Sequence, residues 1–151
     1  MSTNTDYYYT SNNSYGDTII PMTWDIVKKF HRNPPEIKLP RTVETIERYE
    51  TNMKIIKAKQ TISEYLMDKY FSTGDKIVFN RNDYPYFTEP NIYHFLLWIH
   101  PSMKVKDCMI SELIDSHKPE TLDVKEYIYF ENLGNNKSIQ DIRHFHVFIR
   151  C

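Results

Sequence analysis

Three histidines on two predicted strands are the residues whose types and spacing could do chemistry in this chain. His144 and His146 lie two residues apart in the run His144–Arg150, and alternate residues of a strand share a face. His94 lies in Ile92–Ile99, a second run of β-forming residues. An imidazole can act as a base, a nucleophile, a metal ligand or a hydrogen-bond donor to phosphate. We therefore predict that His94, His144 and His146 are catalytic residues that converge on one hollow.

A turn ahead of the first of these strands carries polar and aromatic side chains. Asn82, Asp83 and Tyr84 place an amide, a carboxylate and a phenol beside Pro85. Such a set can hold a base or a sugar ring by stacking and hydrogen bonds, or it can be a rigid turn whose rings cap the core. We predict that Asn82, Asp83 and Tyr84 bind a ligand, together with Trp98, which shares a strand face with His94.

Cationic and amide groups near the last strand are candidate phosphate binders. Residues 134–138 precede a capping-box spacing, and the backbone amides at a helix start can bind an anion. Lys137, Ser138, Arg143 and Arg150 add side-chain donors in the same region. The alternative is a plain connection between a helix and a strand.

A zinc site would need ligands beyond the histidines. Glu89 or Asp83 could join His94, but no characteristic spacing marks such a set, so we predict no metal and no cofactor. Cys108 and Cys151 fit neither a metal motif nor a disulfide framework. This pattern favours a reducing compartment.

The composition excludes several function classes. The 151 residues contain 19 Lys and Arg against 20 Asp and Glu, so no global field attracts nucleic acid or an anionic membrane. The longest apolar run is far shorter than the ~20 residues that span a bilayer, and the N-terminus has no apolar signal segment. We expect a soluble, intracellular protein of the cytoplasm.

Helical patterns occupy much of the N-terminal half. Thr23 is a predicted N-cap for a short helix that ends before residues 33–35, because proline disfavours helical geometry in the residue before it. From Thr42 onward, apolar residues recur on one helical face, and we predict that this stripe packs in the core. Further helices are predicted over residues 62–70 and 109–116. The stripe consists of Val43, Ile46, Tyr49, Met53 and Ile56.

Strands are predicted over residues 76–79, 92–99, 126–131 and 144–150. Both faces of residues 92–99 are largely apolar, which is typical of a central strand covered on both sides. We predict an α+β fold in which helices from the N-terminal half pack on a mostly antiparallel sheet. This single domain covers residues 18–151, and residues 1–17, which are polar and Tyr-rich, form a disordered tail.

Several separated motifs resemble the N-acetylglucosamine-induced protein family, a mostly fungal group with an unassigned domain. They are the turn from Arg81 to Tyr86 with Glu89-Pro90, then Ile92, His94 and Leu97-Trp98, and finally Ser138-Ile139 with His144 to Arg150. Together with Trp24 and Arg48-Tyr49, the likeness covers roughly residues 23–150. The resemblance implies a fold more than an activity.

A more distant likeness is to histidine-triad nucleotide hydrolases and transferases. In those proteins a last strand carries His-x-His-x-His followed by Arg, and this chain has two of the three histidines. Either Phe148 replaces the third or Ile142 the first, and the nucleophile would then be His146 or His144. Loss of one member can abolish covalent nucleotidyl transfer.

Two function classes follow from these patterns. The first is a histidine-lined site for a phosphorylated small molecule, a nucleotide or a sugar nucleotide, with hydrolase or transferase activity as one outcome. The second is a non-enzymatic interaction or regulatory protein that uses the Tyr-rich tail and the aromatic turn. A metal-dependent hydrolase is a third, weaker reading.

Overall fold

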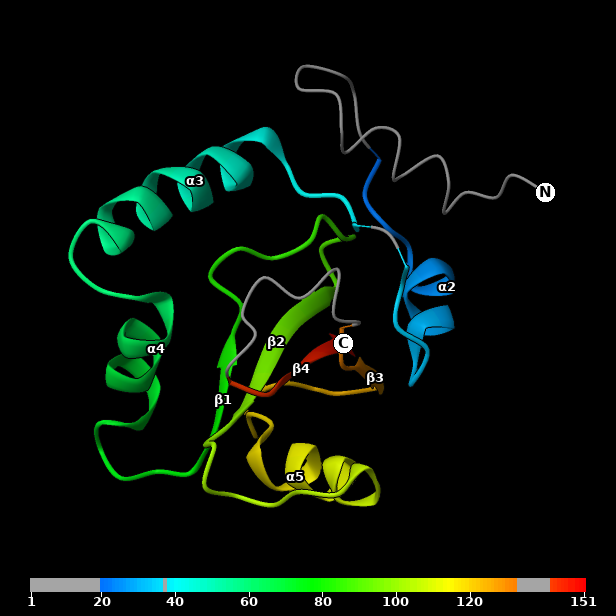
Figure 1. Ribbon diagram of the computed structural model, residues 1–151. Helices are drawn as coiled ribbons and strands as arrows, with labels where there is room; N and C mark the ends of the chain where they lie inside the picture. The colour runs from blue at the N-terminus through cyan, green and yellow to red at the C-terminus, as the bar shows by residue number, and fades with distance from the viewer. Residues whose placement is uncertain (1–19, 37, 133–141) are drawn as a thin grey trace.

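A four-stranded antiparallel sheet forms the centre of the molecule (Figure 1). The computed structural model describes residues 20–36, 38–132 and 142–151. Strands lie in the order β1-β2-β4-β3, and every neighbouring pair is antiparallel. The α+β fold and the central position of residues 92–99 are therefore confirmed. The strands are β1 (Ile77–Arg81), β2 (Ile92–Ile99), β3 (Glu126–Phe130) and β4 (His144–Arg150).

Threonine N-caps define where three helices begin, and the cap at Thr23 was predicted. The hydroxyl groups of Thr23, Thr42 and Thr61 each accept a hydrogen bond from a backbone N–H of the following turn. Thr61 also forms a capping box with Glu64, which satisfies two helix-end N–H groups at once. The helices are α2 (Trp24–Val27), continued by the 3-10 turn η1 (Lys28–Phe30), α3 (Val43–Lys57), α4 (Ile62–Phe71), and α5 (Ile110–His117), preceded by η2 (Asp107–Met109).

One face of the sheet is closed by α5. Ile110 and Ile114 of this helix are fully buried against alternate residues of the two central strands. Because alternate strand residues share a face, this layer takes Phe95 and Leu97 from β2. It takes Phe145, Val147 and Ile149 from β4.

Among the described residues, buried clusters cover the opposite face at its two ends. At one end α2 and η1 pack on the sheet in a cluster with Phe148 and Phe130. At the other end α4 packs through Leu66 and Tyr70 against Trp98. The part of the sheet between these two clusters carries the histidines.

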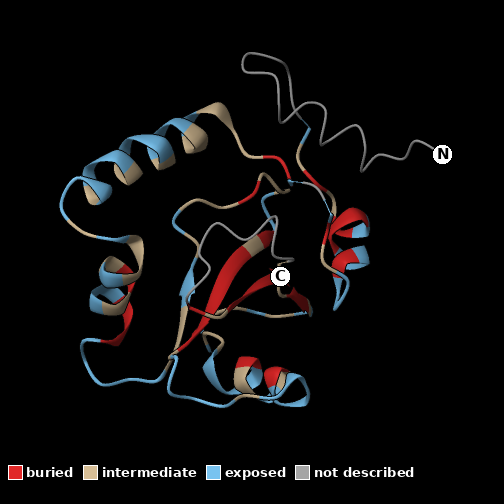
Figure 2. Cartoon of the chain, in the orientation of Figure 1, coloured by how far each residue is buried: buried red, intermediate tan, exposed pale blue. Residues whose placement is uncertain are grey.

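Helix α3 extends from this body as an arm that joins α2 to α4, and it buries none of its residues (Figure 1, Figure 2). The prediction that its apolar stripe packs in the core was therefore wrong. The stripe has helical spacing, but α2 and α4 pack on the two ends of this sheet face, and none of the stripe residues is buried. Two of its members, Tyr49 and Met53, instead line the pocket described below.

Some expectations fall outside the described residues. These are the polar tail over residues 1–17 and the loop that contains Lys137 and Ser138. Among the residues that the structure describes, no helix is long and apolar enough to cross a membrane.

Candidate functional site

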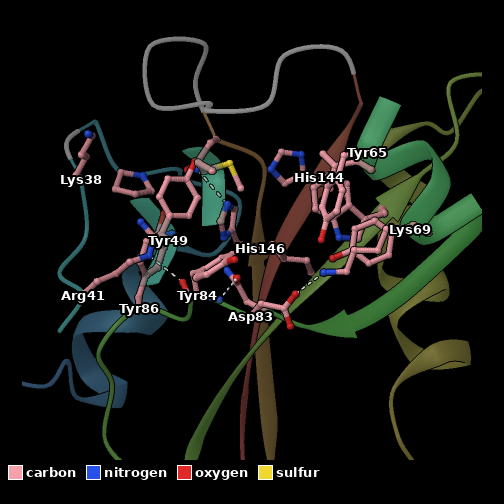
Figure 3. Close-up of a pocket in the computed structure, with 18 residues that line it drawn as sticks. Lys38, Arg41, Tyr49, Tyr65, Lys69, Asp83, Tyr84, Tyr86, His144 and His146 are labelled. Carbon is pink, nitrogen blue, oxygen red and sulfur yellow. Dashed lines mark hydrogen bonds and ion pairs between the residues drawn. The ribbon is translucent and has the colours of Figure 1, made fainter. Parts of the chain in front are cut away.

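A pocket of about 200 Å³ lies over the histidine-bearing face, between the clusters formed by α2 and α4 (Figure 3). Its wall includes residues from the link before α3, from α3 and α4, and from the turn after β1. Residues of β2 and β4 also line it. Its residues are Pro35, Lys38, Arg41, Tyr49, Met53, Tyr65, Leu66, Lys69, Tyr70, Asn82, Asp83, Tyr84, Tyr86, Leu96, Trp98, Asn132, His144 and His146.

Strand register brings the three histidines together. In the β2–β4 pair, Leu96 is opposite His146 and Trp98 is opposite His144, so the imidazoles of His94 and His146 are diagonal neighbours on one face. His94 Nε2 lies 2.8 Å from His146 Nδ1, and the ring centres of His144 and His146 are 5.7 Å apart. His144 and His146 line the pocket, whereas His94 lies behind them.

Hydrogen bonds hold each imidazole in place. The backbone N–H of Tyr86 donates to His94 Nδ1 at 3.1 Å, and the Asn132 amide lies 3.0 Å from His146 Nε2. His144 Nδ1 is 3.1 Å from the carbonyl oxygen of Ile142. The His94 and His146 rings are therefore oriented by partners from other parts of the fold, and the His144 ring by the segment that leads into its own strand.

The His94 and His146 rings are kept neutral by their surroundings. Burial lowers the pKa of His94 well below its usual value, and the charge of Arg41 acts in the same direction. Burial also lowers the pKa of His146, followed by the effects of His94, His144 and Arg41. The rings of Tyr86 and His94 stack at 4.9 Å between centres.

Aromatic rings form most of the pocket wall. Tyr70 stacks on Trp98 at 4.9 Å between ring centres, and Trp98 stacks on His144 at 4.4 Å. On the α3 side, Tyr49 meets the ring of Tyr84 edge to face at 5.1 Å. The indole Nε1 of Trp98 is buried and has no hydrogen-bond partner among the described residues.

Cations lie at both ends of the pocket. In Figure 3, Lys38 and Arg41 are at one end, Lys69 is at the other, and His146 lies between them. The Arg41 guanidinium lies 4.3 Å from the centre of the Tyr86 ring. Lys69 forms an ion pair with Asp83 at 2.5 Å, whereas exposed Lys38 forms none with a described residue.

The predicted turn is built as a rigid side of the pocket. Asn82 Oδ1 accepts a hydrogen bond from the backbone N–H of Tyr84, which closes an Asx-turn. Arg48 of α3 donates to the carbonyl oxygen of Asp83 at 2.7 Å, and the Tyr84 hydroxyl accepts from Asn52 at 2.9 Å. These two bonds fix the distance between α3 and the turn.

Two predicted phosphate binders lie away from the pocket. Arg143 is on the other face, where its guanidinium pairs with Glu131 and Asp107. The odd-numbered residues of β4 point toward α5. Arg143 has an odd number and His144 an even one, so their side chains are expected on opposite faces of the sheet. Arg150 shares the histidine face but lies at the far end of β4, where it pairs with Glu126 at 2.6 Å. Neither arginine lines the pocket.

No group of three or more His, Cys, Asp or Glu side chains within the described ranges is arranged to hold a metal ion. His94 and His146 bond to each other, and Asp83 is committed to Lys69. The weak reading as a metal-dependent hydrolase therefore gains no geometric support from these residues.

Comparison with known proteins places the chain in a family. A family model described as "Protein of unknown function (DUF3605)" matches residues 23–150. The chain belongs to the DUF3605 family. This match covers the sheet, all the helices described above and every described pocket residue.

A curated relative of the DUF3605 chain was also found. N-acetylglucosamine-induced protein 1 of Candida albicans (strain SC5314 / ATCC MYA-2876) is 25% identical over 114 residues, which are 67% of this chain and 45% of that protein. The chain thus spans less than half of that relative. This match and the DUF3605 match support the predicted resemblance to the N-acetylglucosamine-induced proteins. The likeness to histidine-triad proteins stays a prediction.

The fold of the DUF3605 chain also occurs in a solved structure. The crystal structure of a protein called HTC1 has a TM-score of 0.54, with 85% of both chains covered and 15% sequence identity. At this identity the likeness concerns the fold alone.

Sequence reasoning missed several pocket residues of the DUF3605 chain. Lys38 and Arg41 flank a proline in an extended link, and nothing in a link of that kind indicates a binding site. Tyr49 and Met53 share a helical face, and we assigned that face to the core. Asn132 directly follows a predicted strand, a position where polar side chains often reach a site, and this signal could have been used.

Proposed function

We propose that the pocket binds a phosphorylated small molecule with a ring system, a nucleotide or a sugar nucleotide. One observation carries this proposal: six Tyr and Trp rings and three cations line the same small pocket, against one carboxylate. Aromatic rings favour a flat base or a sugar, and an excess of positive charge favours phosphate. The description of the DUF3605 family names no function and no ligand, so the proposal depends on this chemistry.

The ring of the ligand would occupy the end formed by α4 and β2. There Tyr70, Trp98 and His144 form a continuous stack. The buried indole N–H of Trp98, which has no hydrogen-bond partner among the described residues, supplies one donor close to this stack. A base or sugar that offers an acceptor to this N–H would relieve the cost of leaving a buried donor unmade, about 1–3 kcal/mol.

The phosphate would occupy the end formed by the link before α3. Arg41 is fixed there by a 2.8 Å hydrogen bond from Nε to the carbonyl oxygen of Tyr84, and by its contact with the Tyr86 ring. Lys38 lies at the same end (Figure 3). A fixed guanidinium beside a mobile ammonium is a suitable pair for phosphate oxygens.

Noncovalent binding fits this site better than nucleotidyl transfer. The distant likeness to histidine-triad enzymes would make His146 or His144 the nucleophile. In either alignment an apolar residue stands at one triad position, Phe148 or Ile142, and neither side chain can orient an imidazole by a hydrogen bond. We therefore propose that His144 and His146 contact the ligand as polar groups of the pocket floor.

The C. albicans relative is named for induction by N-acetylglucosamine. This name records a response and not an activity, but it makes a nucleotide-linked N-acetylglucosamine a reasonable probe. We would measure thermal unfolding with AMP, UMP, UDP-N-acetylglucosamine, free N-acetylglucosamine and inorganic phosphate. A ligand at 100 times its Kd stabilises the folded state by about 2.7 kcal/mol. The expected result is a rise in Tm with the nucleotides that exceeds the rise with either fragment.

Matched variants test whether the binding occurs in this pocket. Lys38→Ala should weaken binding, whereas Lys59→Ala removes an exposed lysine that does not line the pocket and should not. On α3, Tyr49→Ala should weaken binding, and Ile55→Ala, which removes an exposed side chain of the same helix, should not. Failure of every probe to raise Tm, or equal behaviour within both pairs, would contradict the proposed function.

A further inference from the structure

We propose that His94 is a positioning residue that fixes His146 in the tautomer with its proton on Nε2, so that the pocket floor presents donors and not a base. The claim about the tautomer depends only on hydrogen bonds inside the protein. Its consequence for the ligand deepens the proposed function: the group bound at this point of the floor would be an acceptor, an anionic oxygen of the kind that phosphate carries.

The donor and acceptor roles along the hydrogen bonds from Tyr86 to His94 and His146 are set by a backbone amide. The N–H of Tyr86 points at His94 Nδ1, at 3.1 Å, and a backbone N–H can only donate. His94 Nδ1 is therefore the acceptor, and a neutral imidazole then carries its proton on Nε2. His94 Nε2 lies 2.8 Å from His146 Nδ1, so this proton is donated to His146. It follows that His146 has its own proton on Nε2.

The contact between His146 and Asn132, at the other end of this series of hydrogen bonds, supports the same assignment of donors and acceptors. The Asn132 amide lies 3.0 Å from His146 Nε2 with its nitrogen toward the ring, and its Oδ1 is buried with no hydrogen-bond donor among the described residues. Oxygen and nitrogen of an amide have nearly the same shape, so the partners decide which one faces the imidazole. Exchanging the positions of the amide oxygen and nitrogen lets Oδ1 accept a hydrogen bond from His146 Nε2–H. The exchange gives Oδ1 a donor and matches the tautomer that Tyr86 requires, and it moves Nδ2 to the buried position that Oδ1 occupied.

The opposite direction is excluded by the same contacts. If Asn132 donated to His146 Nε2, the His146 proton would be on Nδ1 and would point at His94 Nε2. His94 would then need its proton on Nδ1, where it would meet the N–H of Tyr86. An imidazolium on either ring creates a similar conflict between two protons.

This polarity gives the pocket floor a chemical preference. In this tautomer, His146 Nε2 has no lone pair available to attack a phosphorus atom or to take up a proton. Asn132 and His146 both line the pocket. A ligand oxygen can replace Asn132 Oδ1 as the acceptor for His146 Nε2–H.

The test is the tautomer itself, which needs no ligand. In protein labelled with ¹⁵N-histidine, long-range ¹H–¹⁵N correlation spectra separate protonated from unprotonated ring nitrogens. We expect His94 and His146 both to carry their proton on Nε2 at pH 7.5. A proton on Nδ1 of either ring, or an imidazolium, would overturn the inference. This outcome is independent of whether any probe binds, so it can be told apart from failure of the proposed function.

Variants separate positioning from packing. His94→Phe keeps an aromatic ring beside Tyr86 and Phe148 but cannot donate, so the spectrum of His146 should change from one tautomer to a mixture. An unchanged His146 spectrum in folded His94→Phe would show that His94 does not set the tautomer. Asn132→Asp provides an acceptor for His146 and should leave its tautomer unchanged. If Asn132→Asp moved the His146 proton to Nδ1, Asn132 would be the donor and the inference would fail.

Discussion

Acid should destabilise this protein through two buried histidines. His94 and His146 are 3% and 5% exposed, and burial lowers the pKa of both rings well below the ordinary value. In the unfolded chain they titrate near a pKa of about 6.5. Below that pH the unfolded state binds two protons that the folded state does not bind, so the free energy of unfolding falls as the pH falls. The contribution of the two neutral rings to the free energy of unfolding is fully present only above about pH 6.5.

The size of the effect follows from proton linkage. Each histidine that is protonated only in the unfolded state changes the free energy of unfolding by up to about 1.4 kcal/mol per pH unit. With an unfolded pKa of about 6.5 and rings that stay neutral in the fold, each loses about 2 kcal/mol between pH 7 and pH 5. The pair together then loses about 4 kcal/mol. This is a large part of the roughly 5–15 kcal/mol that stabilises a typical domain.

Urea unfolding at intervals between pH 7 and pH 5 measures this loss. In His94→Phe the ring at this position cannot titrate, so the acid-induced loss should shrink by about 2 kcal/mol relative to the parent protein. His117→Gln is the matched control, because it removes an exposed histidine of α5 that lies outside the buried pair. Parallel curves for the parent and His94→Phe would refute the reasoning, since His94 would then take up a proton in the folded state.

Two further predictions concern parts of the fold outside the pocket. Thr61→Ala removes the hydroxyl that accepts from the N–H of Glu64 and should cost about 1 kcal/mol in urea unfolding, whereas Thr73→Ala in an exposed turn should cost less. Arg143→Ala leaves the Glu131 carboxylate without this partner and should lower Tm, yet it should not change the affinity for any probe that binds the pocket, as measured by calorimetry. A loss of affinity would place Arg143 in the site after all.

Local sequence rules identified the parts of the site that lie on a single strand. Alternation along a strand placed His144 and His146 on one face, and it placed His94 with Trp98. The same rule, applied to Arg143, puts it on the face opposite to His144 and His146. The cap at Thr23 was also predicted, because a hydroxyl at a helix start satisfies a neighbouring N–H.

The pairing between strands was decided only by the tertiary structure. The 2.8 Å contact between His94 and His146 joins residues that are 52 positions apart, and it exists because the register sets Leu96 opposite His146. A shift of that register by one residue would turn one set of side chains to the other face. No local periodicity encodes this choice, because it depends on how both faces of the whole sheet are covered.

Whether the apolar stripe of α3 is buried was also decided only by the tertiary structure. Its sequence determined a helix with an apolar stripe, since spacing and capping are properties of neighbouring residues. Whether that stripe enters the core depends on which surfaces remain uncovered, and α2 and α4 had already buried both ends of the histidine face. Two residues of the stripe, Tyr49 and Met53, therefore line the pocket. Sequence alone fixed which side chains share a face, and the competition among helices for the sheet decided which faces are buried.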